Sequence, residues 1–370
     1  MKILILNWQD RLNPLAGGAE THLHEVFKRI VNLGHSVTLF CSKFNGAKKD
    51  EVVDGIKVIR KGSRWFFNFR VIWEYLIRFR KNDFDIVVDD LNKIPFFTPL
   101  YVKKPLVGVT HHLFRKSIFS ETIFPLALYV YLMEFFSLPF YKKKRFIVGS
   151  PSTLKELLDN NFVKSKVHHI PYGVDHNIYK PDAENNNSEQ LIGMLGRLKK
   201  YKSIDILLNA FSKVLIKLPT AKLLIVGEGD DKKRLIEISE LLKINNSVYF
   251  AGFVSEEEKI KYLQKIKFAV NTSIKEGWGL TVIEANACGV PTISSNVEGL
   301  RDAVIDGKTG FLIKYGDINS FADAMIELLE NKEKLNQLSI NAVEWSKNFD
   351  WDKAAFDTLE IFKKVIEEEK

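Results

Sequence analysis

Short apolar runs alternate along this chain with longer stretches in which apolar residues recur every three or four positions. In the first half, runs at 2–7, 36–41, 56–60, 84–90 and 105–110 predict buried strands. In the second half, runs at 191–195, 222–227, 247–251, 267–271 and 291–295 predict another set. Helical periodicity separates the runs, as at Glu20–Leu33 before Gly34. This repeated order predicts doubly wound parallel sheets of the α/β class.

The length of 370 residues exceeds that of one ordinary domain. We therefore predict two Rossmann-like domains, residues 1–175 and 176–350, with a hinge within Pro171–Gln190. A last helix is predicted over 351–370. Ligands of doubly wound sheets lie beyond the carboxyl ends of the strands. The two domains thus predict one shared site, lined by residues that directly follow strands.

Composition narrows the class of protein. A hydrophobic content of 46% and a charged content of 27% are typical of a soluble globular protein. The two cysteines, Cys41 and Cys288, do not suit a disulfide scaffold and indicate a reducing cytosol. No signal peptide and no apolar run of ~18 residues is visible, so no membrane span is predicted. Residues 1–180 hold 28 Lys+Arg against 16 Asp+Glu, which suggests that the first half faces something anionic.

The segment 275–299 contains the most informative chemistry. Glu276 and Glu284 flank a Gly-Trp-Gly turn at the start of a predicted helix, directly after a predicted strand. A helix start presents free amide groups and a positive dipole end, which bind phosphate. Two carboxylates beside it can accept hydroxyl hydrogen bonds, which suits a nucleotide-sugar. The alternative is that Thr281 and Glu284 merely form a capping box.

Further motifs occur in register along nearly the whole chain. They are Gly17–Glu20, Gly108–His112, Val148–Ser152, Pro171–Asp175, Gly196–Leu198 with Lys202, Ile225–Gly229 and Gly252–Val254. Together with the E-x7-E segment they resemble the family 4 retaining glycosyltransferases. That resemblance implies the GT-B fold, in which two such domains face each other across a cleft. It also implies that the last helix crosses back to the first domain, which binds the acceptor, while the second domain binds the nucleotide-sugar.

The resemblance assigns roles to the second domain. Glu276 is expected to accept hydroxyls of the donor sugar, and Glu284 those of the ribose. Arg197 and Lys202 are expected to stabilise the leaving diphosphate electrostatically. Ser203 stands where the family usually has glycine, and Trp278 where phenylalanine is commoner. The remaining expected donor contacts are Gly196, Val254, Gly277, Trp278, Gly279 and the backbone amides of Leu280 and Thr281.

The basic run around Lys202 also allows a simpler interpretation. Arg197 and Lys202 are alternatively part of a solvated basic surface, and Lys199 and Lys200 compete for the role of Lys202.

In the first domain, the resemblance points to His111 as a contact of the donor sugar or leaving group. A histidine that only caps a strand end is the alternative, and the neighbouring His112 makes a shift of one residue possible. Gly17 and Gly18 are expected to let the backbone approach the diphosphate and acceptor. No G-x-G-x-x-G follows the first strand, so a dinucleotide-binding fingerprint is not supported.

A metal-dependent enzyme would need an Asp-x-Asp among other oxygen ligands. The two candidates, at 83–85 and 350–352, lack that context and are interpreted as surface residues. Because Arg197 and Lys202 supply positive charge, we predict no metal and no cofactor. No zinc-ligand spacing involves the two cysteines.

Two stretches, 64–81 and 114–145, mix aromatic residues with arginine or lysine. Basic amphipathic helices of this kind bind anionic membrane surfaces, although such helices also cover sheets with their apolar faces. The prediction is a retaining, metal-independent glycosyltransferase on the cytoplasmic face of a membrane. Its partners would be a nucleotide-diphosphate-sugar and a glycan or lipid-linked acceptor, with no nucleic acid. The alternatives are another GT-B enzyme, such as a phosphorylase or sugar-nucleotide epimerase, and a non-enzymatic basic binding module.

Overall fold

The computed structural model describes residues 1–92, 94–182 and 189–369, and the chain forms two compact units. Unit 1 comprises Met1–Gly173 and Asp350–Lys370, and unit 2 comprises Val174–Phe349. The predicted domain boundary after residue 175 lies two residues beyond the end of the first segment of unit 1. Residues 183–188 of the predicted hinge lie outside the described residues.

Unit 1 is built on an eight-stranded sheet with the order β3-β4-β2-β1-β5-β6-β7-β8. All neighbours pair in parallel except β3 and β4. These two form a hairpin whose turn, Asp54-Gly55, has positive φ at both residues, a conformation favoured in tight hairpins. The strands are β1 (Lys2–Leu6), β2 (Ser36–Cys41), β3 (Asp50–Val53), β4 (Ile56–Arg60), β5 (Ile86–Asp90), β6 (Leu106–Thr110), β7 (Arg145–Val148) and β8 (Val167–His169).

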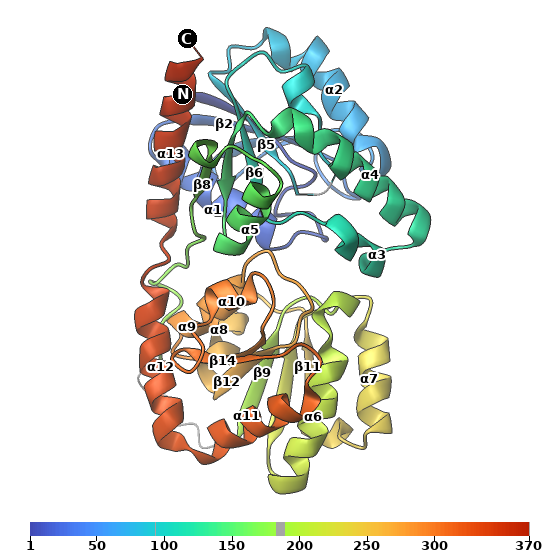
Figure 1. Ribbon diagram of the computed structural model, residues 1–370, viewed down its shortest axis with the longest axis vertical. Coiled ribbons are helices and arrows are strands. Elements are labelled where there is room, and N and C mark those ends of the chain that lie inside the picture. The colour runs from blue at the N-terminus through green and yellow to red at the C-terminus, as the bar shows by residue number, and fades with distance from the viewer. Residues whose placement is uncertain (93, 183–188, 370) are drawn as a thin grey trace. The chain divides into compact units, whose positions relative to one another are not determined.

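Helices cover this sheet on both faces (Figure 1). On one face, α1 (Gly18–Asn32) packs along α13 (Trp351–Glu368), the last helix of the chain. On the other face, α2 (Phe67–Ile77) and α4 (Phe124–Tyr141) share a core cluster with alternate residues of the strands, such as Leu4 and Leu6. The remaining helices include α3 (Ile118–Glu121) and α5 (Pro151–Asp159). Where the chain returns to unit 1, its backbone passes close to Gly173. A Cβ added to Gly173 would lie 2.2 Å from the backbone nitrogen of Trp351.

Unit 2 contains a six-stranded parallel sheet with the order β11-β10-β9-β12-β13-β14. The strand order reverses between β9 and β12, so the switch point of this sheet lies there. The strands are β9 (Leu191–Leu195), β10 (Lys222–Val226), β11 (Val248–Gly252), β12 (Phe268–Asn271), β13 (Thr292–Ser295) and β14 (Gly310–Ile313).

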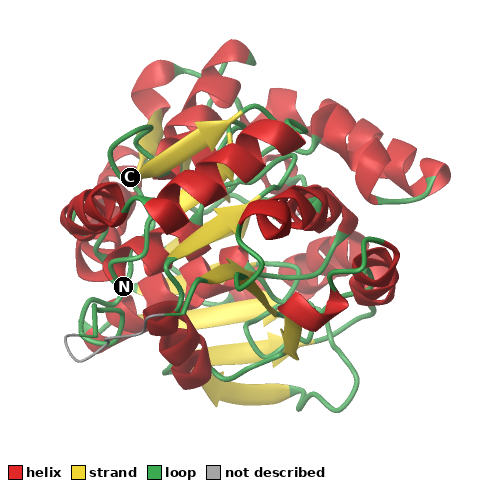
Figure 2. Ribbon diagram, turned by 90° about the horizontal axis from the view of Figure 1, so that it is seen from below, coloured by secondary structure: helices red, strands yellow, loops and turns green. Residues whose placement is uncertain are grey.

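The helices of unit 2 form two groups, and Figure 2 shows strands as a layer with helices around it. In the first group, α6 (Ile204–Lys217) packs against α11 (Ile318–Glu330) and α7 (Lys232–Leu241). In the second, α9 (Leu280–Ala287) packs against α12 (Lys332–Ser346) and α10 (Leu300–Ala303). The fully buried Phe211 and Phe321 bring α6 and α11 into one core with the sheet. α8 (Glu256–Lys265) lies beside α9, as shown by an ion pair described below.

The fold class predicted from the sequence is confirmed. Every predicted strand is present, and its ends lie within two residues of the prediction. The prediction did not identify β3, β7, β8 and β14 as strands. These strands have three or four residues each, too few for periodicity to be distinguished from a loop.

Candidate active site

Two loops meet at the switch point of unit 2, one after β9 and one after β12. The loop after β9 begins with Gly196, whose φ of +149° suits glycine. The loop after β10 lies directly against it. A Cβ on Gly227 would approach the Gly196 oxygen to 1.9 Å, and one on Gly229 would approach the Leu198 oxygen to 2.0 Å. The Gly-Glu-Gly motif therefore permits close contact between neighbouring loops.

The predicted residues Lys202 and Glu276 are brought together by these two loops. The Lys202 ammonium donates to Glu276 Oε1, which also accepts from the Ser273 hydroxyl at 2.7 Å. Ser273 in turn donates to Asn271 Oδ1 at 2.6 Å, so the end of β12 orients the carboxylate. Burial alone would lower the pKa of Lys202, but the Glu276 carboxylate outweighs burial and the pKa is raised. The pair is a nearly buried cation and anion at a strand end.

The competing lysines are engaged differently. Lys199 pairs with Asp230 at 2.6 Å, and Lys200 is exposed. Ser203, which replaces the usual glycine, has a left-handed backbone with φ of +49°. Glycine adopts that conformation without strain. Arg197 is exposed and its guanidinium donates to the Tyr201 hydroxyl at 3.2 Å.

The second predicted carboxylate lies on α9. This helix begins at Leu280 after Gly279, and no side chain caps it. The capping-box interpretation of Thr281 and Glu284 is therefore wrong, because Glu284 lies beyond the first turn. Its Oε1 accepts instead from the Lys259 ammonium of α8 at 3.0 Å. The first amides of α9, including Leu280 and Thr281, cannot bond within the helix and remain available at its start.

Tyr179 completes the surroundings of Glu284. The Lys259 ammonium lies 5.0 Å above the Tyr179 ring, and the tyrosine hydroxyl donates to Glu256 Oε1 at 3.0 Å. Burial, followed by the charges of Glu284 and Glu256, raises the pKa of Tyr179 far above its usual range. Glu284 is thus held by a cation from α8 and flanked by a neutral phenol.

The Gly-Trp-Gly turn and Val254 also belong to the predicted donor contacts. A Cβ added to Gly299 would lie 2.3 Å from the backbone carbonyl oxygen of Glu276. The loop that contains Gly299 therefore packs closely against the turn that carries Gly277. Trp278 is buried and packs edge-on against Phe349, with ring centroids 5.3 Å apart. Its indole therefore supports the turn from inside unit 2. Val254 is half-buried and precedes Ser255, which caps α8.

In unit 1, the predicted glycines stand at the start of α1. The Gly17 nitrogen donates to Glu20 Oε2 at 2.7 Å, and the other oxygen of Glu20 accepts from the Asn92 amide at 2.5 Å. A Cβ on Gly18 would meet nothing within 4 Å, so open space lies in front of it. The loop after β5 thereby fixes the carboxylate that caps α1.

His111 lies at the carboxyl end of β6 and is buried. Its Nε2 lies 3.1 Å from Asp90 Oδ1, and its Nδ1 contacts the Tyr172 hydroxyl. The Tyr172 ring stacks on His22 at 4.3 Å. Burial and then the nearby His111 hold the pKa of His22 well below its usual range. Both ring nitrogens of His111 thus have protein partners, whereas the half-buried His112 packs edge-on against Phe114 at 4.9 Å.

Several partners of the predicted residues were not identified from the sequence. They are Asp90, Tyr172, Tyr179, Lys259 and Ser273. Asp90 carried a signal, since it is a polar residue at the carboxyl end of a predicted apolar strand. For Tyr179 and Lys259 the sequence contained no such signal, because neither residue is near Glu284 in the chain.

Among residues 1–92, 94–182 and 189–369, no group of three or more His, Cys, Asp or Glu side chains could hold a metal ion. The two Asp-x-Asp segments have local partners. Lys2 contacts Asp83 with its ammonium and Asp85 with its backbone nitrogen. Asp350 caps α13, and Asp352 pairs with Arg29.

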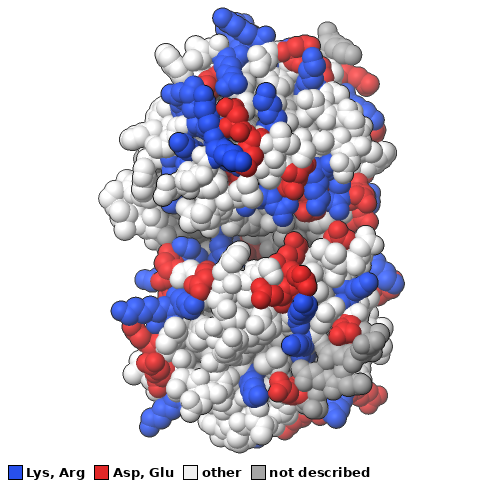
Figure 3. Space-filling view, turned by 180° about the vertical axis from the view of Figure 1, so that it is seen from behind, with Lys and Arg blue, Asp and Glu red and all other residues white. Residues whose placement is uncertain are grey.

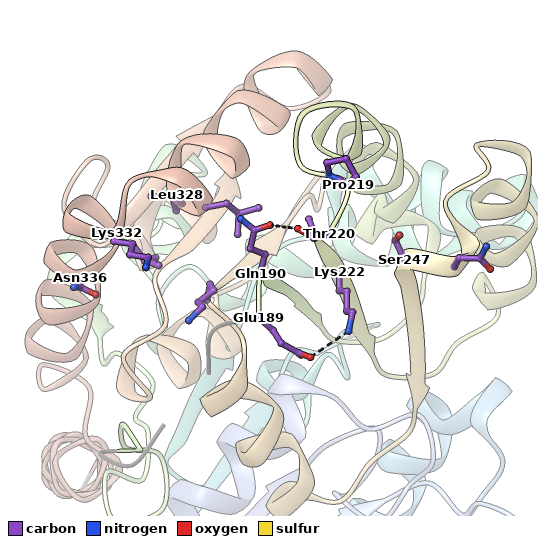
Figure 4. Close-up of a pocket in the computed structure, with 14 residues that line it drawn as sticks. Glu189, Gln190, Pro219, Thr220, Lys222, Ser247, Leu328, Lys332 and Asn336 are labelled. Atoms are coloured by element: carbon purple, nitrogen blue, oxygen red, sulfur yellow. Dashed lines mark hydrogen bonds and ion pairs between the residues drawn. The ribbon is translucent and has the colours of Figure 1, made fainter. Parts of the chain in front are cut away.

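A hollow of about 940 Å³ opens at the opposite end of the sheet of unit 2 (Figure 4). Its lining includes Gln190, Lys222, Ser247 and Lys267, which stand at the amino ends of the strands. None of the predicted site residues lines it. The hollow is therefore separate from the carboxyl-end cluster.

The aromatic stretches of unit 1 are partly exposed. α2 and α4 lie side by side, joined by a bond of 3.0 Å from the Asn68 amide to the Tyr129 hydroxyl. We give the name aromatic surface to nine exposed apolar residues that lie on or directly before these helices: Trp65, Phe66, Phe69, Trp73, Ile123, Phe124, Phe135, Phe136 and Phe140.

The sequence predicted no membrane-spanning segment, but α4 is long and apolar enough to be considered as one. By length and composition it would suffice to cross a bilayer, with 18 residues and a mean hydropathy of 1.3. A third of it, 33%, is buried inside the fold. Its inner residues pack in the core of unit 1, so we interpret α4 as a surface helix. Figure 3 shows few charged side chains on the lobe that α3 and α4 form.

Two family models match adjacent parts of the chain. The model described as Glycosyltransferase Family 4 matches residues 16–178. The model described as Glycosyl transferases group 1 matches residues 175–345. Together they span both units.

Individual proteins are similar over the whole length. An uncharacterized glycosyltransferase of Methanocaldococcus jannaschii is 26% identical, over 99% of both chains. Sucrose-phosphate synthase from Thermosynechococcus elongatus has a TM-score of 0.84 at 20% identity, over 99% of both chains. Anabaena HepE in complex with UDP and glucose has a TM-score of 0.77 at 20% identity, over 98% of this chain and 100% of that one. Other curated relatives, among them D-inositol 3-phosphate glycosyltransferases, are matched over only 40% to 57% of their own length.

Proposed function

This chain belongs to the family 4 glycosyltransferases, and we propose that it transfers a sugar from a nucleoside diphosphate-sugar to a hydroxyl of a glycan or lipid-linked acceptor. The observation that carries the proposal is the cluster at the switch point of unit 2. It combines the Lys202–Glu276 and Lys259–Glu284 pairs with the start of α9. Bound UDP and UDP-glucose in similarly folded Anabaena HepE structures support a donor of this class.

The proposed chemistry follows from the charges of this cluster. Charge develops on the diphosphate as the sugar–oxygen bond breaks, and Arg197 and Lys202 supply fixed positive charge to stabilise it. The amides of Leu280 and Thr281 would hold the distal phosphate at the helix start. Glu276 and Glu284 would accept hydroxyls of the sugar and the ribose. No metal is required in this scheme, and retention would follow from attack on the face that the diphosphate leaves.

The residues of unit 1 enter the proposal as contacts of the reacting sugar and the acceptor. The open space before Gly18 supports an approach to the backbone at the start of α1. For His111, binding a sugar hydroxyl would require the Tyr172 hydroxyl to give up its contact with Nδ1. Asp90 would keep the ring oriented during that exchange.

A panel of nucleoside diphosphate-sugars tested by thermal unfolding checks the donor proposal. A ligand at about 100 times its Kd stabilises the folded state by about 2.7 kcal/mol, a shift of several degrees in Tm. Glu284→Ala and Arg197→Ala should lose the shift while remaining folded. Glu257→Ala is the matched control, because Glu257 is an exposed glutamate of α8 that pairs only with Lys261 among the contacts described. Full donor affinity in both site variants would contradict the assignment.

Product analysis separates the transferase from the other GT-B enzymes. A transferase consumes its donor in proportion to a glycosylated acceptor. Hydrolysis or inversion of the donor sugar without acceptor would instead indicate an epimerase.

We further propose that the enzyme works at the cytoplasmic face of a membrane and docks there through the aromatic surface. Apolar side chains on two adjacent helices are exposed by up to 67%. Basic residues flank them, with Arg64, Arg78 and Arg80 around α2 and Lys142–Lys144 after α4. The Arg64 guanidinium lies 5.6 Å above the Trp65 ring. Aromatic and basic side chains together favour the interface of an anionic bilayer.

Flotation with vesicles containing about 30% phosphatidylglycerol tests the docking. The wild-type protein should float with these vesicles and much less with purely zwitterionic ones. The double variant Phe135→Ser, Phe136→Ser should bind at least about tenfold more weakly, since it removes exposed apolar area. Phe356→Ser is the matched control, because Phe356 is 58% exposed on α13, away from the aromatic surface.

A further inference from the structure

The inner face of α4 carries one buried carboxyl group among apolar residues. Glu134 is 2% exposed, and both of its oxygens accept from backbone amides of a single loop. Oε2 accepts from the Phe114 nitrogen at 2.7 Å, and Oε1 from the Arg115 nitrogen at 3.0 Å. The Arg115 guanidinium lies 3.7 Å from Oε1. Buried acceptors engaged in this way fix the backbone that donates to them.

The loop that Glu134 holds is the one that begins at His111. It leaves β6, passes His112 and Leu113, and reaches the short turn at Arg115–Ser117. Arg115 has a left-handed φ of +48°. A residue other than glycine keeps such a backbone only where its surroundings hold it. The conformation of this loop therefore depends on where α4 places Glu134.

The far end of α4 has a second link to the surroundings of His111. Tyr141, the last residue of the helix, donates to Asp89 Oδ2 at 2.5 Å. Asp89 is followed by Asp90, whose carboxylate contacts His111 Nε2 at 3.1 Å. One side of α4 thus faces solvent with the aromatic surface, and the other side contacts the loop that begins at His111 and the end of β5, which carries Asp90.

We infer that α4 transmits membrane contact to the His111 loop, with Glu134 as the positioning residue that makes the connection. The inference rests on the proposed docking of the aromatic surface. A bilayer that holds the outer face of α4 restricts the motion of the helix. Through Glu134 this restriction stabilises the amides of Phe114 and Arg115 and the loop that carries His111. The enzyme would then be most ordered for transfer where a membrane-borne acceptor is present.

Hydrogen exchange with and without vesicles of about 30% phosphatidylglycerol tests the inference on the whole protein. In the wild type, bound vesicles should slow exchange of the Phe114 and Arg115 amides by roughly tenfold. In Glu134→Ala these amides should exchange at the same rate with and without vesicles, while flotation stays at the wild-type level. Glu134→Gln retains one acceptor oxygen and should recover part of the effect.

Glu156→Ala is the matched control. Glu156 also accepts from this loop, at the Leu113 nitrogen at 3.2 Å, but it lies on α5 outside the aromatic surface. Removing the Glu156 carboxylate should speed exchange of the Leu113 amide. Vesicles should still slow exchange of the Phe114 and Arg115 amides in this variant. Wild-type protein that floats with vesicles but shows no slowing of these amides would overturn the inference and leave the docking proposal standing. Wild-type protein that does not float would overturn both.

Discussion

Carboxylates lie near the carboxyl ends of central strands in both sheets, but Glu276 and Glu284 of unit 2 have other partners than Asp89 of unit 1. In unit 2, Glu276 and Glu284 are each paired with a lysine, Lys202 and Lys259. In unit 1, Asp89 at the end of β5 accepts from two hydroxyl groups, those of Thr98 and Tyr141. Lysines thus hold the two carboxylates of the candidate site in unit 2, whereas hydroxyl groups hold Asp89 in unit 1.

This difference fits different tasks. Such ion pairs can exchange partners with a charged, hydroxyl-rich ligand, because carboxylates accept hydrogen bonds and ammonium groups donate them. A buried acid among hydroxyl groups instead gives a fixed scaffold, because its ionisation is costly. We therefore expect variants of the ionic cluster in unit 2 to change donor binding, with or without a loss of stability, and variants of Asp89 to change mainly stability.

The largest expected effect concerns Asp89. Burial raises the pKa of this carboxyl to about 7, against the lowering effect of Thr98 and Tyr141. The folded protein keeps the proton up to about pH 7, whereas the unfolded chain releases it near pH 4. The free energy of unfolding should therefore fall as pH rises from about 4 to about 7, by up to roughly 4 kcal/mol for this group, and then level off.

Asp89→Asn should remove that fall, because the amide does not titrate. Urea unfolding of both proteins at several pH values between 4 and 8 measures the difference. The wild type and the variant would show parallel pH profiles if Asp89 were ionised throughout this range.

The next effect tests the ionic cluster of unit 2. Glu276→Ala leaves the Lys202 ammonium nearly buried without its carboxylate, which should cost unit 2 roughly 3 kcal/mol of stability and abolish transfer. Glu298→Ala is the matched control in the neighbouring loop, since Glu298 is exposed and should change stability by less than about 0.5 kcal/mol. Urea midpoints report the effect. Equal midpoints for the two variants would contradict the importance of the pair.

A smaller effect is expected at the second pair. Lys259→Met removes the cation that orients Glu284 and should weaken donor binding about tenfold, or about 1.4 kcal/mol, with little change in Tm without ligand. Lys261→Met serves as the control, because Lys261 pairs with the exposed Glu257 on the same helix. Calorimetric titration with the donor found in the panel provides the measurement. Tighter binding by Lys259→Met would show that the lysine competes with the ribose for Glu284.

The smallest effect concerns Ser203. Ser203→Gly relieves a left-handed backbone but also loses the contact of 3.1 Å with the Tyr315 hydroxyl. These contributions oppose each other, so the free energy of unfolding should change by less than about 1 kcal/mol, which a measurement of Tm would report as a small shift. Donor affinity should stay the same. A large loss of affinity would mean that the hydroxyl itself contacts the donor.

Much of the architecture was accessible from the sequence, because a buried parallel strand must be apolar along its length. The alternative of a non-enzymatic basic module was wrong, since the chain is a glycosyltransferase. The position of site residues directly after strands was predictable as well, as for Lys202 after β9 and Glu276 after β12. The capping alternative for Glu284 was wrong because the helix begins at Leu280, and helix ends depend on contacts that periodicity does not record.

The sequence by itself determined the order of the longer strands, the class of fold and which loops carry polar residues. It did so because periodicity and strand-end chemistry are local properties. Only the tertiary structure decided which partners those residues have. Lys259 meets Glu284 because α8 and α9 lie side by side, and Glu134 meets the His111 loop because α4 packs across the sheet. Such contacts join residues that are distant in the chain, and the packing of whole helices determines them.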